Sequence, residues 1–234
     1  SLYIPFSLGA GKSKTIRVMM SWYVPESNMK IGEPMNDEKK DCDPESGCCA
    51  GPKDLGIDTG KQTSSATYKP WYSSKFENVE QVAEYWRNNY ADLHKKTKTF
   101  NEAFYASTLP AEVMEAVAAN LTIIKSPTVL RQYDGRLWNW EGCSDDNGCC
   151  HGSCTHVWNY AQAVPHLFPA LERSLRNTEF RENQNADGHQ GFRANIPISP
   201  LVHNFHAAAD GQLGGIMKVY REWRISGDND WLKK

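Results

Sequence analysis

The chain has 234 residues, and 26 Lys and Arg against 28 Asp and Glu give it a formal net charge of −2. This near-neutral balance argues against nucleic-acid binding, because it leaves no basic footprint for phosphates. A hydrophobic content of 40% with eight Trp excludes a disordered chain. No apolar run approaches the ~20 residues of a membrane span.

Alternating apolar residues at the start of the chain predict two β-strands. Residues 2–8 and 15–24 alternate on either side of Gly9-Ala10-Gly11, a pattern typical of a hairpin. A lone hairpin is marginal in water, so we expect it to pair with strands that precede Ser1 or to pack on helices. Ser1 follows neither an initiator Met nor a signal peptide, so we expect the native N-terminus to lie upstream.

A polar stretch, residues 25–74, predicts a long loop, and helices are expected after it. Asn78 with Gln81 is a predicted capping pair at the first helix. Three further helical segments are predicted at 111–125 behind Pro110, at 156–176 with a kink or break at Pro165 and Pro169, and at 207–224 before Gly227. Residues 128–140 are expected to be extended or irregular and residues 177–206 loop-like, and the last helix carries Leu213, Ile216, Tyr220 and Trp223 on one face.

Glu141 is the leading candidate for chemistry. It lies in the densest stretch of the sequence, 137–160, directly after Trp138, Asn139 and Trp140. Sugar faces stack on aromatic rings, and a carboxylate can attack or stabilise an oxocarbenium-like centre, so this pattern suits glycoside chemistry. The alternative interpretation is a surface glutamate beside core tryptophans.

Seven cysteines form two clusters, each containing Cys-x5-Cys-Cys. Disulfides between the clusters, or plain buried thiols, are one interpretation. A structural metal, zinc or calcium, is the other, although the spacing is not a clean zinc frame. The cysteine content favours an oxidising compartment such as the periplasm or the exterior, and the cytosol stays open. The clusters are Cys42, Cys48 and Cys49, then Cys143, Cys149, Cys150 and Cys154, and the candidate metal ligands are Cys149, Cys150, His151 and Cys154.

Several histidines are candidates for sugar contacts or for ordinary protein hydrogen bonds. His156 lies beside Trp158 and Asn159 at the head of the third helical segment. His203 and His206 precede Asp210, and His189 lies in a predicted turn. Asp210 is expected either to orient a group near the site or to stabilise a helix N-terminus.

At these residues the sequence resembles glycoside hydrolase family 116, which contains bacterial β-glucosidases and non-lysosomal glucosylceramidases. The similarity lies in Trp140-Glu141-Gly142, in the Pro-x-Leu-Glu-x-Ser-Leu pattern of 169–175, and in a helix running from Asp210 through Tyr220-Arg221-Glu222 to Ser226-Gly227-Asp228. Upstream, residues 14–22 resemble the end of the family's β-sandwich, 72–107 its linker, and Leu109-Pro110 the start of its helical domain.

The resemblance implies an α+β multidomain fragment of a retaining β-glycosidase that needs no cofactor. Residues 1–74 would be the last strands of a β-sandwich plus a long loop, 75–109 a helical linker, and 110–234 the first part of an (α/α)6 catalytic barrel. Glu141 corresponds to the family's nucleophile, while the acid/base Asp is expected beyond residue 234, so this chain alone is expected to be inactive. The predicted substrate is a β-linked oligosaccharide or glycolipid, the predicted partner is the rest of the polypeptide, and the residues shaping the sugar site would be Trp138, Trp140, His156, Trp158, Asn159 and Asp210.

Two departures from the family pattern leave the sugar open. The cysteine-rich stretch with residues 155–158 replaces the segment that follows the nucleophile in relatives. Ile196-Pro197-Ile198-Ser199 replaces a Val-Pro-His-Asp turn that grips sugar hydroxyls. Glucose, xylose and N-acetylglucosamine therefore all stay open. A non-catalytic carbohydrate-binding module or a metal-stapled structural fragment is the alternative function.

Overall fold

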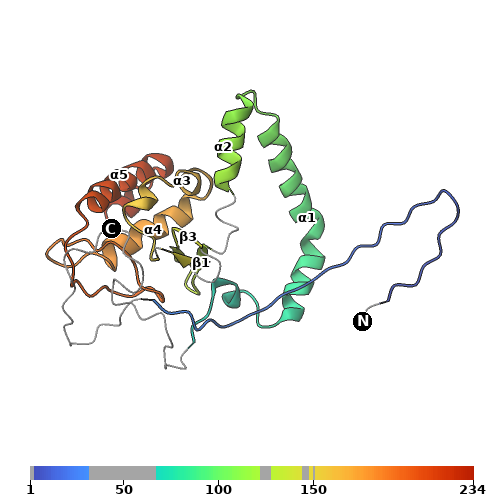
Figure 1. Ribbon diagram of the computed structural model, residues 1–234, viewed down its shortest axis with the longest axis horizontal. Coiled ribbons are helices and arrows are strands. Elements are labelled where there is room, and N and C mark those ends of the chain that lie inside the picture. The colour runs from blue at the N-terminus through green and yellow to red at the C-terminus, as the bar shows by residue number, and fades with distance from the viewer. Residues whose placement is uncertain (1–2, 32–66, 122–127, 144–147, 150) are drawn as a thin grey trace.

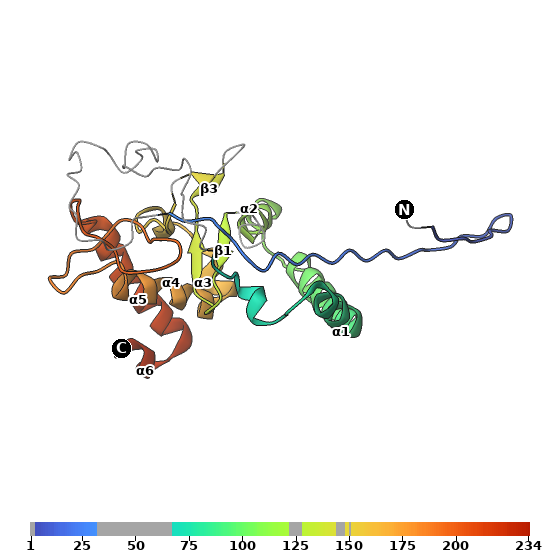
Figure 2. The ribbon, with the colours of Figure 1, turned by 90° about the horizontal axis from the view of Figure 1, so that it is seen from below.

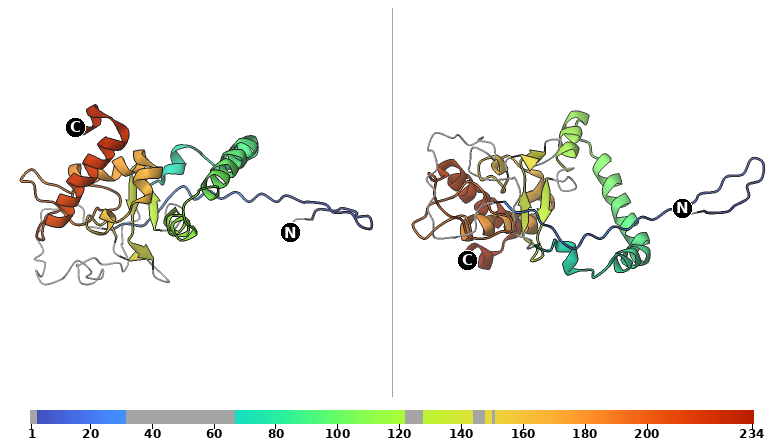
Figure 3. Two further views of the ribbon diagram at one scale, coloured as in Figure 1. Left: turned by 90° about the horizontal axis from the view of Figure 1, so that it is seen from above. Right: turned by 60° about the horizontal axis from the view of Figure 1, so that its bottom comes forward.

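The structure is a computed structural model that describes residues 3–31, 67–121, 128–143, 148–149 and 151–234. Helices α3, α4 and α5 pack together as one body with short strands beside them, and α1 and α2 form a V next to it (Figure 1). The first residues run past α1 and away from this body, as the view from below shows (Figure 2). The two views of Figure 3 also show the first residues running away from the body formed by α3, α4 and α5.

The predicted hairpin forms its turn but no strand ladder. Lys12 N donates to Gly9 O at 3.1 Å around Ala10 and Gly11, and residues 3–24 are otherwise extended without strand pairing among the described residues. Phe6, Val18 and Trp22 are exposed, so no sheet or helix covers the alternating side chains. Among the described residues no further strand pairs with this segment, and a lone hairpin is marginal in water. Leu2 and the cluster of Cys42, Cys48 and Cys49 lie outside the described residues.

Local signals set the first helices where the sequence predicts them. After a 3-10 turn, η1 (Trp71–Ser74), helix α1 (Val79–Tyr105) begins at Asn78, whose side chain accepts a hydrogen bond from Gln81 N at 2.9 Å. Gln81 Oε1 in turn accepts from Glu77 N at 2.9 Å, which confirms the predicted capping pair. Helix α2 (Ala111–Leu121) follows Pro110 as expected, and residues 122–125 of that prediction lie outside the described part. Within the described chain, no helix has both the length and the apolar composition to cross a membrane.

A small antiparallel pair organises the core. Strands β1 (Val129–Arg131) and β2 (Leu137–Asn139) pair with Leu130 opposite Trp138. Because successive side chains of a strand point to opposite faces, β2 contributes side chains to two apolar clusters. Leu137 packs with Cys154, Trp158, Val164 and Leu175, whereas Trp138 and Trp140 pack with Ile31, Ala194, Ile196 and Ile198.

Beyond β2 the chain forms a second short pair and then the helices of the body. Strand β3 (Gly142–Cys143) pairs with β4 (Gly148–Cys149). The third helical segment is broken as predicted, because Pro169 has no N–H to continue the helix before it. It comprises η3 (Val157–Asn159), α3 (Ala163–Leu167) and α4 (Pro169–Arg181). Helix α5 (Ala209–Ser226) ends at Gly227 with φ 66°, and α6 (Asn229–Leu232) follows.

Helix α5 buries its polar side. Leu213, Ile216 and Tyr220 are exposed, whereas Lys218 and Glu222 are buried against α4. Burial lowers the pKa of Lys218 to about 8, with the neighbouring charge of Arg176 as the second cause. Three cations and three carboxylates form this buried cluster: Glu172, Arg176 and Glu179 on α4, and Lys218, Arg221 and Glu222 on α5.

The β-sandwich and the (α/α)6 barrel stay predictions. In the part of the chain that the structure describes, strands occur as the two pairs β1–β2 and β3–β4. The helices of the body form one packed group rather than a closed ring (Figure 1).

Candidate functional site

Glu141 lies two residues beyond the end of β2, in an ion pair with Arg193. The guanidinium NH1 of Arg193 is 3.0 Å from Glu141 Oε1, and it also donates to the carbonyl oxygen of His151 at 2.9 Å. The side chain of Glu141 is 17% exposed and that of Arg193 is 11% exposed. The carboxylate is therefore largely sheltered from water and balanced by one cation, while part of it stays accessible.

The backbone around Gly152 explains how Arg193 reaches Glu141 across 52 residues. Gly152 has φ +83°, and a Cβ there would lie 2.6 Å from Ala194 O. Ala194 N donates to Gly152 O at 2.7 Å, and Thr155 N donates to Phe192 O at 3.0 Å. Sequence reasoning missed Arg193, because it lies in a predicted loop without a motif.

Cys154 is a buried free thiol, and Glu141 is one of the groups that influence its pKa. Burial and the negative charge of Glu141 raise the pKa of Cys154 to about 12, against the opposing effects of Arg193 and a backbone hydrogen bond. The environment of Cys154 therefore favours the protonated thiol over the thiolate.

The candidate metal set is only partly described. Cys150 lies outside the described residues, and the side chain of Cys149 is not described either. Within the described chain, no three His, Cys, Asp or Glu side chains are grouped so that they could hold a metal ion. The zinc or calcium site therefore stays a prediction.

His151 is buried, and its ring lies edge-on to Trp140 with 6.2 Å between ring centroids. Burial, together with the charge of Arg193, lowers the pKa of His151 to about 4. The folded protein keeps this ring neutral at pH values where the unfolded chain already binds a proton.

Acidification is expected to remove about 3 kcal/mol of folding stability through His151. The unfolded ring titrates near 6.5 and the folded ring near 4, so this contribution is full above pH 6.5 and is lost progressively down to about pH 4. The free energy of unfolding, measured with urea at pH 7 and pH 4, should fall less between these pH values for His151→Gln than for the parent chain. The exposed His166→Gln is the matched control, and equal losses in all three proteins would contradict the prediction.

The tryptophans of the predicted sugar site are core side chains in this structure. Trp138 is fully buried, donates from Nε1 to Ala194 O at 3.1 Å, and meets Trp140 edge to face at 5.0 Å. Trp158 is buried in the cluster with Leu137 and Cys154. These rings are therefore part of the two apolar clusters and are not exposed.

His156 and Asp210 form a second pair. His156 Nδ1 is hydrogen-bonded to Asp210 Oδ2, and both side chains are exposed. This hydrogen bond is the main reason why the pKa of Asp210 is lowered. Asn159 lies against α5 at Gly214, where an added Cβ would lie 2.3 Å from Asn159 Nδ2.

The candidates His189, His203 and His206 lie on the segment between α4 and α5. The rings of His189 and His203 lie 4.8 Å apart, and His206 packs against Phe192 at 5.3 Å. Partial burial and His189 lower the pKa of His203.

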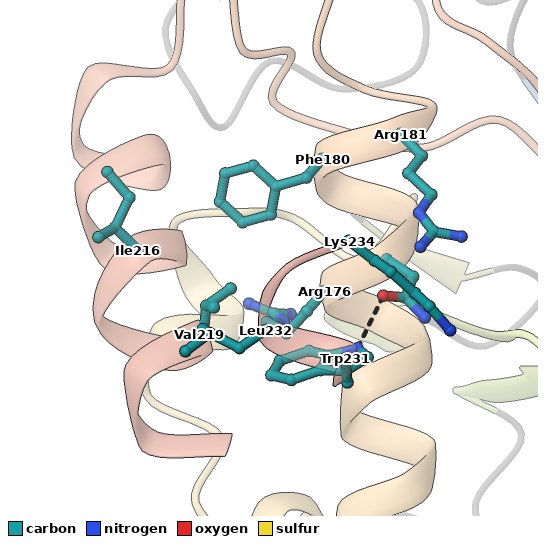
Figure 4. A pocket seen from close by; sticks show the side chains of 9 residues that line it. Arg176, Phe180, Arg181, Ile216, Val219, Trp231, Leu232 and Lys234 are labelled. Atoms are coloured by element: carbon teal, nitrogen blue, oxygen red, sulfur yellow. Dashed lines mark hydrogen bonds between the residues drawn. The ribbon is translucent and has the colours of Figure 1, made fainter. Parts of the chain in front are cut away.

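A cavity of about 280 Å³ lies between α4, α5 and α6 (Figure 4). Phe180, Ile216 and Trp231 contribute apolar surface, and Arg181 and Lys234 lie at its wall. None of the residues predicted for the sugar site lines this cavity, which therefore lies apart from Glu141.

A scan against protein-family models finds no match for this chain, and a search of curated proteins finds no significant relative.

Proposed function

We propose that the chain carries the nucleophile of a retaining β-glycosidase similar to glycoside hydrolase family 116, with Glu141 in that role. The observation that carries the proposal is the Glu141 carboxylate itself. It is mostly buried, follows the two core tryptophans Trp138 and Trp140, and is balanced by Arg193 at 3.0 Å. The order of the family-like motifs along the sequence is the second support.

The reaction proceeds in two steps. A Glu141 oxygen forms a bond to the anomeric carbon as the bond from that carbon to the leaving oxygen breaks, and a second carboxyl group protonates the leaving oxygen. Water then attacks the anomeric carbon, the second carboxylate takes a proton from the water, and Glu141 departs as a carboxylate. The proposal assigns the second group to the Asp that the family places further along the chain.

Unpartnered buried polar atoms on residue 139 and on residues 155–159 support a ligand rich in hydroxyl groups. The side chains of Asn139, Thr155, Trp158 and Asn159 each have at least one buried atom without a hydrogen-bond partner among the described residues. Buried polar groups are normally hydrogen-bonded, so these donors and acceptors suit sugar hydroxyls or bound water.

Exposed apolar side chains support the proposed larger fold. Leu213, Ile216 and Met217 on α5 are exposed, as are Val18 and Trp22 in the extended segment. A barrel around α5 and a sheet beside residues 15–24 would remove these surfaces from water.

Covalent labelling tests the assignment. The full-length protein is incubated with activated 2-deoxy-2-fluoro β-glucoside and β-xyloside, and peptides are analysed by mass spectrometry. The expected result is one glycosyl group on the peptide that contains Glu141. A label on another carboxylate, or turnover of an aryl β-glycoside without any trapped Glu141, would overturn the proposal.

A further inference from the structure

We propose that Arg193 is a positioning residue for Glu141, held in place by a clamp formed by residues 151–155 and 192–194. This inference rests on the proposed function, because it describes how the nucleophile of that reaction is aligned. It assigns a role to residues 151–155, which lie in the stretch where the sequence departs from the family pattern.

One guanidinium nitrogen joins the two sides of the clamp. Arg193 NH1 contacts Glu141 Oε1 at 3.0 Å and His151 O at 2.9 Å. The carboxylate is therefore fixed relative to the backbone of 151–155. Since both charged side chains are largely buried, their Coulomb attraction is screened less than that of an exposed ion pair.

Both segments of the clamp are tied to the strand that leads to Glu141. Ser153 N donates to Asn139 O at 2.7 Å, and Ser153 Oγ accepts from Asn139 N at 3.0 Å. Trp138 Nε1 donates to Ala194 O at 3.1 Å. Arg193 and Glu141 therefore share one rigid support, β2.

Two residues with a left-handed backbone conformation allow residues 151–155 to lie close to residues 192–194. Gly152 and Ser153 have φ +83° and φ 53°. A Cβ at Gly152 would lie 2.7 Å from Ala194 N and 2.8 Å from Arg193 Cβ. Replacing this glycine would therefore displace Arg193 without removing it.

Alignment of the nucleophile matters because a displacement of about 1 Å can lower a rate about 100-fold. Arg193 also stabilises the carboxylate that Glu141 becomes again when the glycosyl bond is hydrolysed. Loss of Arg193 should therefore slow the second step more than the first, so that the glycosyl-enzyme accumulates and kcat and KM fall together.

The kinetic test uses the full-length protein and an activated aryl β-glycoside. Arg193→Met is expected to lower kcat about 100-fold, with a lower KM. Arg193→Lys should recover at least about tenfold of that loss, because it restores the charge. Gly152→Ala, which keeps the arginine, should reproduce the loss. The control is Arg136→Met, since Arg136 pairs with Asp134 and Glu182 outside the clamp. Equal effects of Arg193→Met and Arg136→Met, or no recovery with lysine, would overturn the proposal.

A mutant cycle separates this proposal from the proposed function. Unfolding equilibria are measured for Glu141→Gln, Arg193→Met and the double variant, with no substrate present. The clamp predicts that the two substitutions are coupled by at least about tenfold in the unfolding constant. Additive effects would overturn the clamp even in an active glycosidase. Coupling in a protein that hydrolyses no β-glycoside would support the clamp and reject the proposed function alone.

Discussion

Replacing Glu141 with Gln is expected to lower kcat/KM for an activated aryl β-glycoside by about 10⁴-fold or more in the full-length protein, a loss of about 5.5 kcal/mol in transition-state stabilisation. Gln keeps the size of the side chain and a hydrogen-bond acceptor for Arg193, but its amide is not a nucleophile. The measurement is initial rates with an activated aryl β-glucoside and β-xyloside.

Glu182→Gln is the matched control, because this carboxylate pairs with Arg136 at 2.8 Å away from the clamp. Its activity should stay close to that of the parent. Azide rescue of Glu141→Gly is a second test. The small anion can occupy the space left by the side chain and attack the anomeric carbon. The expected product is a glycosyl azide of inverted configuration. Undiminished turnover in Glu141→Gln would reject the nucleophile assignment.

Arg176→Met is expected to destabilise the chain by about 3–5 kcal/mol, because it removes a cation from a buried charge cluster. Arg176 is 1% exposed, and its NH1 lies 2.8 Å from Glu179 Oε2 while its Nε lies 3.4 Å from Glu172 Oε1. Met preserves much of the volume, so the main change is an excess of buried negative charge. Urea unfolding at pH 7 measures the effect.

A second substitution tests the charge argument directly. In Arg176→Met with Glu172→Gln, Glu179 keeps Lys218 at 3.1 Å and Glu222 keeps Arg221 at 2.9 Å. Most of the lost stability should then return. Arg87→Met breaks an exposed pair with Glu84 and should change stability by less than about 0.5 kcal/mol. If the double variant were as unstable as Arg176→Met alone, lost packing rather than charge would explain the effect.

Features that depend on a few neighbouring residues were predictable from sequence. Asn78 with Gln81 sets the start of α1, Pro169 separates α3 from α4, and Gly227 ends α5 in the left-handed region. Each acts through its own backbone geometry or a hydrogen bond within one helical turn, so no knowledge of the tertiary fold is needed.

Features that depend on distant partners were not predictable. The periodicity of α5 identifies an apolar face, but it does not indicate that the opposite face would be buried by charges on α4. Arg193 shows the same limit, because its role depends on the left-handed backbone at Gly152 and Ser153. The extended residues 3–24 show another limit, since alternation predicts strands only where a sheet is present to receive them.

The glycines of α5 set the distance between this helix and residues 155–159. An added Cβ at Gly211 would lie 2.2 Å from Thr155 Oγ1, and one at Gly214 would overlap the side chain of Asn159. The helix can approach residues 155–159 only because these positions carry no side chain, and the same approach brings Asp210 to His156. A methyl group added at either glycine would push α5 away from residues 155–159. Substitutions at these two positions could therefore be used to widen the gap between the helix and this segment.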